Sequence, residues 1–179
     1  MMKLLTLVSA IAATIAVNAA SCNWSTTGSI YSPTDSTATL AGFTAYLFDT
    51  TTISQSALVT ALRDGGSITD YSAMSTYTTD SAAKVATTAF TQDSGKTIEA
   101  FFAIVDGDYV YISNSKSAVT ADVGDAKFSF ASQSTLSKNV FDSSTAYSSA
   151  GWYQTVPEPT SGLLMLLGMA GLALRRRRA

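Results

Sequence analysis

The chain has 179 residues, of which 46% are hydrophobic and 13% are charged, and its formal net charge at neutral pH is −2. It contains no histidine and one cysteine, which excludes Ser-His and Cys-His nucleophilic pairs, histidine or thiolate zinc sites and an intrachain disulfide. Residues 20–155 carry twelve acidic and six basic side chains, and this acidic balance argues against nucleic acid as a partner.

The first 19 residues have the pattern of a secretory signal peptide. Lys3 precedes an apolar run from Leu4 to Val17, and Val17-Asn18-Ala19 has small or tolerated residues at the two positions that a signal peptidase reads. We therefore predict cleavage by signal peptidase after Ala19 and export of the remainder.

Residues 20–155 are expected to form a single β-rich extracellular domain. Ser and Thr make up 45 of these 136 residues. Threonine favours strands and serine favours turns, and the aromatic residues spread through the middle of this stretch are typical of a packed core. The composition predicts a mainly β, β-sandwich-like domain with one short helix.

The first half of the domain contains one predicted strand and the helix. The strand covers residues 37–48, with one side formed by Leu40, Gly42, Thr44, Tyr46 and Phe48. The helix is indicated by apolar spacing at Ile53, Ala57, Leu58, Ala61 and Leu62. Thr52 and Gln55 have capping-box spacing, and Gly65 and Gly66 end the helix. We expect it to cover an end or an edge of the sandwich.

The second half contains the strongest strand signals. Asp106-Gly107 joins the apolar runs 97–105 and 108–112, a pattern that predicts a hairpin with a type I′ turn. Further strands are predicted at 85–91, 126–130 and 151–155, and the polar stretches 68–82 and 131–150 are predicted to be loops. Trp152 and Tyr153 are expected to end the last strand rather than sit at a membrane interface.

No residue of the domain is predicted to be catalytic, to ligate a metal or to bind a cofactor. Asp106 and Asp108 are read as turn residues, because calcium needs more oxygen ligands than the pair supplies. Asp122 and Asp125 lie close in sequence, and Glu99 is the only glutamate of the domain. A glycosidase pair formed by distant carboxylates stays open as an alternative.

The residues around Cys22 allow two further modifications. Cys22 is either a passive thiol near the mature N-terminus or a lipidated first residue, although Ala19 replaces the leucine-like residue usual before a lipidated cysteine. Asn23-Trp24-Ser25 fits a glycosylation acceptor pattern.

The last 24 residues have a separate organisation. Residues 156–161 contain Pro157-Glu158-Pro159, residues 162–174 are apolar and uncharged, and Arg175, Arg176, Arg177 and Arg178 follow. The apolar run, as a helix, spans about 20 Å against a hydrocarbon core of about 30 Å. We expect a short single membrane helix, held by the arginines as a stop-transfer signal on the cytoplasmic side.

The order of Val156, Pro157, Glu158, Pro159, the apolar run and the basic end resembles the PEP-CTERM sorting tail, a tail also labelled the ice-binding protein C-terminal domain. The resemblance implies a Gram-negative bacterium, an exosortase-type processing enzyme, a transient inner-membrane intermediate and delivery to the cell surface or extracellular matrix. Pro157, Glu158 and Pro159 would be recognition residues of a substrate. The resemblance covers residues 156–179 and implies nothing about the activity of residues 20–155.

Together these features predict an exported surface or extracellular-matrix-associated protein with a non-enzymatic structural or adhesive role. The alternative is a secreted carbohydrate-active hydrolase or a carbohydrate-binding module on the same tail. An extracellular polysaccharide is therefore a candidate partner.

Overall fold

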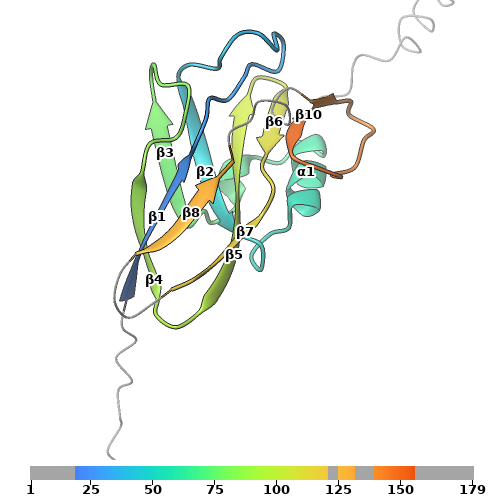
Figure 1. The fold of residues 1–179 in the computed structure, drawn as a ribbon. Coiled ribbons are helices and arrows are strands. Elements are labelled where there is room, and N and C mark those ends of the chain that lie inside the picture. Colours follow the sequence, from blue (N-terminus) through green and yellow to red (C-terminus); the bar gives the residue numbers. More distant parts are fainter. Residues whose placement is uncertain (1–18, 121–124, 132–138, 156–179) are drawn as a thin grey trace, which may run out of the picture.

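A computed structural model describes residues 19–120, 125–131 and 139–155, which form ten strands, one α-helix and one 3-10 helix (Figure 1). The mainly β prediction is confirmed. Most of the predicted signal peptide and the whole of the predicted tail, residues 156–179, lie outside the described residues. Among the described helices none is long and apolar enough to cross a membrane.

The strands form two sheets. One has three strands in the order β4-β1-β8, and the other has β3-β2-β5-β6-β10-β9 with β7 also paired to β5. The elements are β1 (Ala19–Thr26), β2 (Phe43–Asp49), α1 (Gln55–Arg63), η1 (Ile68–Asp70), β3 (Ser75–Thr79), β4 (Thr88–Asp93), β5 (Thr97–Asp106), β6 (Tyr109–Ile112), β7 (Lys116–Val119), β8 (Ala126–Phe130), β9 (Val140–Phe141) and β10 (Gly151–Gln154).

One core lies between the two sheets and is rich in aromatic residues. Phe102 of β5 is at its centre, with ring centroids 5.0 Å from Phe130, 5.5 Å from Tyr111 and 5.9 Å from Trp24. All four side chains are buried. Large aromatic side chains remove much apolar surface from water when they are buried. This contact can therefore hold the two sheets together without a disulfide.

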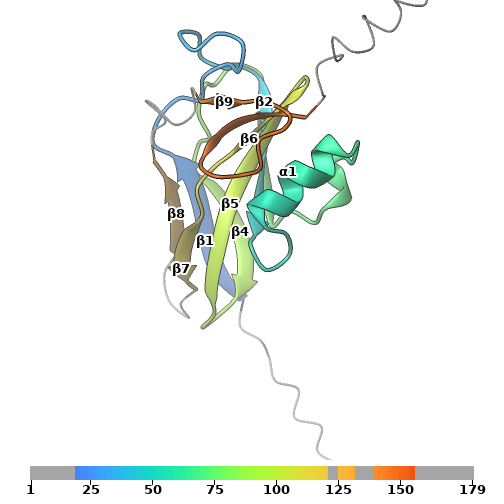
Figure 2. The same cartoon turned by 90° about the vertical axis from the view of Figure 1, so that its right-hand side faces the viewer.

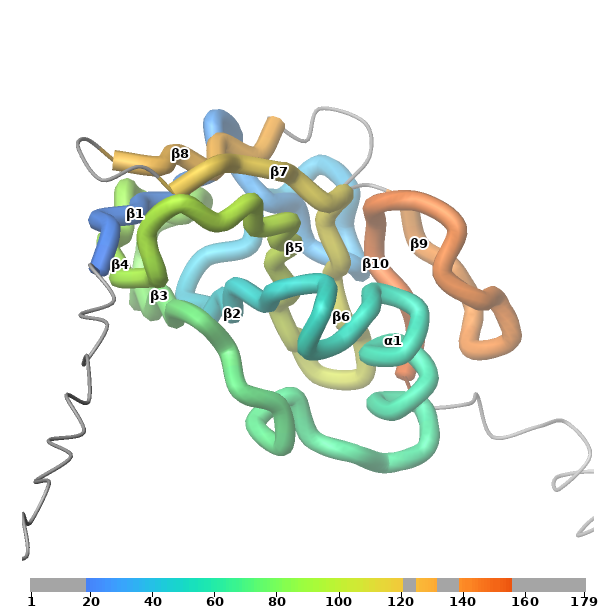
Figure 3. The backbone as a smooth tube through the Cα atoms, turned by 90° about the horizontal axis from the view of Figure 1, so that it is seen from below, coloured from blue at the N-terminus to red at the C-terminus, as the bar shows by residue number. Residues whose placement is uncertain are grey.

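A second core lies on the opposite face of the larger sheet, beneath α1. Phe48, Phe101 and Val110 of the sheet meet Leu58 and Leu62 of the helix. Figures 2 and 3 show α1 on one side of the larger sheet and the smaller sheet on the other. The prediction that the helix covers an end or an edge was wrong, since α1 forms a third layer. It can do so because β2 and β5 carry apolar residues on both faces of the larger sheet.

The ends of α1 are fixed by local chemistry. The N-cap is Ser54, whose hydroxyl accepts from the Ala57 N–H at 3.2 Å, and not the predicted Thr52. Ile53 and Leu58 flank this cap in the same apolar cluster, as in a hydrophobic staple. At the other end the Gly66 N–H donates to the Ala61 carbonyl and the Gly65 N–H to the Leu62 carbonyl, a Schellman motif with Gly65 at φ +89°.

Several strand predictions needed correction. The strand predicted at 37–48 begins only at Phe43, after Gly42 at φ +75°, because that backbone conformation interrupts an extended strand. The strand predicted at 85–91 is β4, shifted to Thr88–Asp93. The predicted loop 68–82 contains η1 and β3, which pairs with β2 although its residues are all Ser, Thr or Tyr.

The hairpin predicted around residue 107 is confirmed, but its turn differs. Asp106 pairs with Tyr109, so the two turn residues are Gly107 and Asp108. Only Gly107 has a positive φ, +55°, which is the pattern of a type II′ turn. The strand predicted at 126–130 is β8, and the one at 151–155 is β10, which ends at Gln154.

Candidate functional site

The structure shows how the residues just before the predicted sorting motif are held in the fold. Thr155 follows β10, and its N–H donates to the Asp108 carbonyl at 2.7 Å while its hydroxyl donates to the same oxygen at 2.8 Å. Asp108 belongs to the β5–β6 turn. The end of the described domain is therefore fixed to a neighbouring hairpin. Val156, Pro157, Glu158, Pro159 and the four arginines 175–178 lie outside the described residues.

A second attachment holds this end of β10 to the helix. The Arg63 Nε donates to the Gln154 carbonyl at 3.2 Å, and its Nη2 donates to the Asp142 carbonyl at 2.8 Å. The guanidinium carbon also lies 5.9 Å from the centre of the Tyr153 ring. One cation thus joins α1, β10 and the loop after β9, close to the residue where the tail begins.

Trp152 and Tyr153 are fully buried within β10, as predicted for the last strand. The Trp152 Nε1 donates to the Tyr31 carbonyl at 2.9 Å. The Tyr153 hydroxyl donates to the Ser149 carbonyl at 2.6 Å and accepts from two backbone N–H groups, those of Ser148 and Ser149. Both polar atoms have partners inside the fold, so these side chains stabilise the domain and do not face a membrane.

The face of the larger sheet beside α1 is hollowed. A groove of about 380 Å³ is lined by Gly42, Phe43, Thr44, Tyr46, Ile68, Thr78, Thr79, Asp80 and Val105. A second hollow of about 230 Å³ shares Ile68 and Val105 with it and reaches Thr155. We call the two together the sheet-face groove. It connects the beginning of β2 with the exit point of the tail.

The acidic residues considered from the sequence do not converge. Asp106 and Asp108 flank Gly107 at the β5–β6 turn, whereas Asp125 lies before β8 in the other sheet. Glu99 is exposed and accepts a hydrogen bond from the Ser115 hydroxyl. Within residues 19–120, 125–131 and 139–155 no group of three or more Cys, Asp or Glu side chains is arranged to hold a metal ion. Asp122 lies outside these ranges.

Cys22 is buried in β1, the central strand of the smaller sheet, between Phe90 of β4 and Ala126 of β8. Burial raises the pKa of its thiol, and the nearby Asp125 adds to this effect. A lipid on this sulfur would require β1 to leave the core, so the structure favours a passive thiol. Ala19, the predicted cleavage position, is the first residue of β1.

The sequence alone did not indicate Arg63 or Tyr46. Arg63 was an isolated basic residue at the end of a predicted helix, and its two carbonyl partners are 79 and 91 residues away in the chain. Tyr46 was correctly placed on the same side of its strand as Phe48. It is half-buried and packs against the apolar cluster beneath α1, a contact that no local pattern reports.

Residues 155–178 match the family model of the PEP-CTERM protein-sorting motif. No curated protein and no solved structure matches the chain. The family match confirms the resemblance noted for the C-terminal residues. The chain therefore carries a PEP-CTERM protein-sorting motif, which implies export to the cell surface and processing by an exosortase-type enzyme.

Proposed function

We propose that the chain is a non-enzymatic surface or extracellular-matrix protein, released from the inner membrane by cleavage near Pro157-Glu158-Pro159. The observation that carries this proposal is the position of the matched motif, which begins at Thr155 immediately after the last strand of a folded domain. The described strands thus form a packed unit on the N-terminal side of the proposed cleavage point.

The geometry at Thr155 supports release of an intact domain. From Thr155 to Pro157 the chain extends by at most about 7 Å. Cleavage at or beyond Pro157 removes none of the contacts made by Arg63, Trp152 or Thr155. The released product should consequently keep β10 in the sheet and retain the stability of the uncut protein.

The non-enzymatic role is supported by composition. The chain lacks histidine, so general acid–base chemistry and nucleophile activation by an imidazole are impossible. Its cysteine is buried in a central strand. A surface rich in hydroxyl groups and moderately acidic is suited to a hydrated matrix.

The proposal is tested by replacing Pro157, Glu158 and Pro159 with alanine in the full chain. We expect the variant to accumulate in the inner-membrane fraction, while the wild-type protein appears at the surface or in the medium. Glu99→Ala is the matched control, because Glu99 and Glu158 are the two glutamates of the chain and Glu99 is exposed on the domain. Release of the triple variant at the wild-type rate would refute the sorting function.

Mass spectrometry of the released wild-type protein provides the second readout. We expect a C-terminus between residues 156 and 161. Thermal denaturation of the same product should give an unfolding midpoint equal to that of the uncut chain. A product ending before Gln154 would lose at least the Gln154–Tyr109 pair of β10 and β6 and would contradict release of an intact domain.

A further inference from the structure

We propose that the sheet-face groove binds a neutral polysaccharide chain. This inference deepens the proposed surface function by giving the domain a ligand class, and it rests on that function only for its biological setting. Binding by the groove is a property of the folded domain and can be measured separately.

The groove has an aromatic platform at Tyr46. The Tyr46 and Phe48 rings are nearly parallel, with an interplanar angle of 17° and centroids 6.4 Å apart. Phe48 is fully buried, so it supports one face of the Tyr46 ring and restricts its rotation. Tyr46 is half-buried and lines the groove together with Thr44, the preceding residue on the same side of β2. A half-exposed ring beside a buried aromatic neighbour is suited to contact the C–H face of a sugar ring.

Hydroxyl groups surround this platform. The hydroxyls of Thr44 and Thr78 share a hydrogen bond of 3.0 Å across the β2–β3 pair, and each keeps further capacity. The Thr79 hydroxyl accepts from the Ala82 N–H at 2.9 Å and from the Ser81 N–H at 3.3 Å, and its own hydrogen can donate to a ligand. Sugar hydroxyls act as both donors and acceptors, so such a rim is complementary to them.

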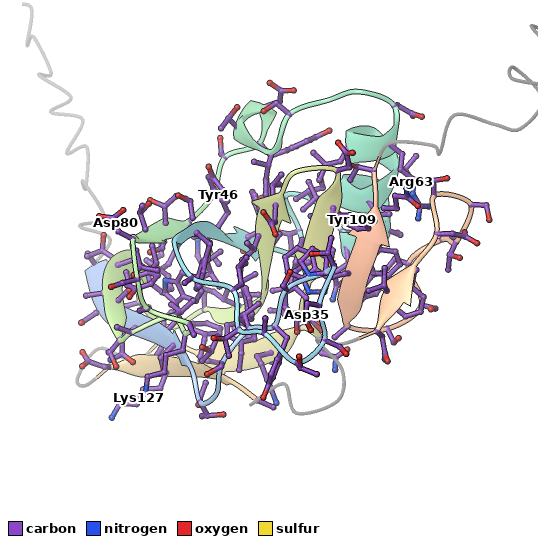
Figure 4. The ribbon with its side chains drawn as sticks, turned by 90° about the horizontal axis from the view of Figure 1, so that it is seen from above. Asp35, Tyr46, Arg63, Asp80, Tyr109 and Lys127 are labelled. Atoms are coloured by element: carbon purple, nitrogen blue, oxygen red, sulfur yellow. The ribbon has the colours of Figure 1, made fainter. Side chains whose placement is uncertain are left out.

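The charge and shape of the groove specify the ligand further. Asp80 is the one charged residue among those lining its two hollows, and it lies beyond the end of β3 on the side from which Tyr46 projects (Figure 4). A single carboxylate without a cationic neighbour in the lining accepts hydrogen bonds from hydroxyls but repels an anionic polymer. The hollows join at Ile68 and at Val105, whose exposed fraction is 39%. The continuous groove therefore favours a chain of sugars over a single residue.

The test uses the full chain in a polyoxyethylene detergent, which contains no sugar. The protein is run by affinity electrophoresis through gels containing laminarin, hydroxyethylcellulose, dextran or galactomannan, and any retarding polymer is followed by calorimetric titration with its hexaose. We expect retardation by at least one polymer. Tyr46→Ala should weaken binding by about tenfold or more, as truncation of a central aromatic anchor does, and Tyr46→Phe should restore most of it.

Two variants distinguish the groove from general stickiness. Thr78→Ala should weaken binding by a smaller factor, whereas Thr91→Ala, an exposed threonine of the edge strand β4 on the other sheet, should leave it unchanged. Absence of retardation in all four gels, or equal binding by wild type and by folded Tyr46→Ala, would overturn the proposal. Neither result would affect the membrane-release experiment, so the failure of one proposal is separable from the failure of the other.

Discussion

The two faces of the larger sheet are covered in different ways. On one face the smaller sheet provides Trp24 and Phe130, and the core formed there is closed. On the other face α1 provides Leu58, Val59 and Leu62 over the middle of the sheet, and the strip along β2 and β3 stays open as the sheet-face groove.

The difference follows from the dimensions of the covering elements. Six strands side by side span about 24 Å, whereas the nine-residue helix is about 14 Å long and about 10 Å wide. The three strands of the smaller sheet are five to eight residues long, about 17–27 Å, so they extend further along their partner strands than the helix does. A partly covered sheet face thus combines a stable domain with an accessible surface.

The largest expected effect is on the closed face. Phe102→Ala removes a ring that contacts Trp24, Tyr111 and Phe130, and should lower the free energy of unfolding by about 3–5 kcal/mol. The measurement is urea denaturation followed by tryptophan fluorescence. Phe90→Ala, at the partly exposed margin of the same core, is the control and should cost clearly less. Equal losses would mean that the aromatic centre is not the principal contact between the sheets.

The helix-covered face should be less sensitive. Leu58→Ala removes a buried residue that packs with Ile53, and we expect a loss of about 3 kcal/mol in the free energy of unfolding. Thr60→Ala, on the exposed side of α1, should change it by less than about 0.5 kcal/mol. The same denaturation assay checks both. An unchanged stability for Leu58→Ala would contradict the docking of α1 on the sheet.

One atom of the closed face is expected to be destabilising. The Tyr111 hydroxyl is buried and has no hydrogen-bond partner among the described residues, and burial raises the pKa of this phenol far above its usual range. Tyr111→Phe should therefore raise the free energy of unfolding by about 1 kcal/mol. Tyr153→Phe is the matched control, because it removes three hydrogen bonds and should lower the free energy of unfolding by about 1–3 kcal/mol. A loss of stability in Tyr111→Phe would show that the hydroxyl is satisfied in solution.

The smallest expected effect concerns the loop after β9, which Arg63 joins to α1. Side-chain hydrogen bonds from Ser144 and then Thr145, together with their backbone N–H groups, lower the pKa of Asp142. A carboxyl with a lowered folded pKa stabilises the native state above its unfolded pKa of about 3.9, and this contribution is lost as the pH falls through the lower folded value. Asp142→Asn and Ser144→Ala should each show a slightly shallower loss of stability below about pH 4 in acid titrations followed by circular dichroism. An acid-unfolding profile identical to that of the wild type would contradict a stabilising role for the Asp142 carboxylate.

Local patterns in the sequence were sufficient for the features whose physics is local. The alternation at 126–130, the glycine of the β5–β6 turn, the helix-ending pair Gly65-Gly66 and the PEP-CTERM motif all follow from neighbouring residues. Strand β3 was missed because five Ser, Thr and Tyr residues carry no apolar alternation, and β2 alone makes them a strand.

Only the tertiary structure decided what lies on each face of the larger sheet and how the end of β10 is held. The layer position of α1, the Arg63 contacts with Asp142 and Gln154, and the place of Tyr46 in the groove depend on residues far apart in the chain. Such contacts depend on how much of a sheet its neighbours can cover, a property of element lengths and packing that no single segment encodes. The sequence by itself determined the type of fold and the presence of the sorting motif, whereas the packing of unequal layers determined which part of the larger sheet stays open.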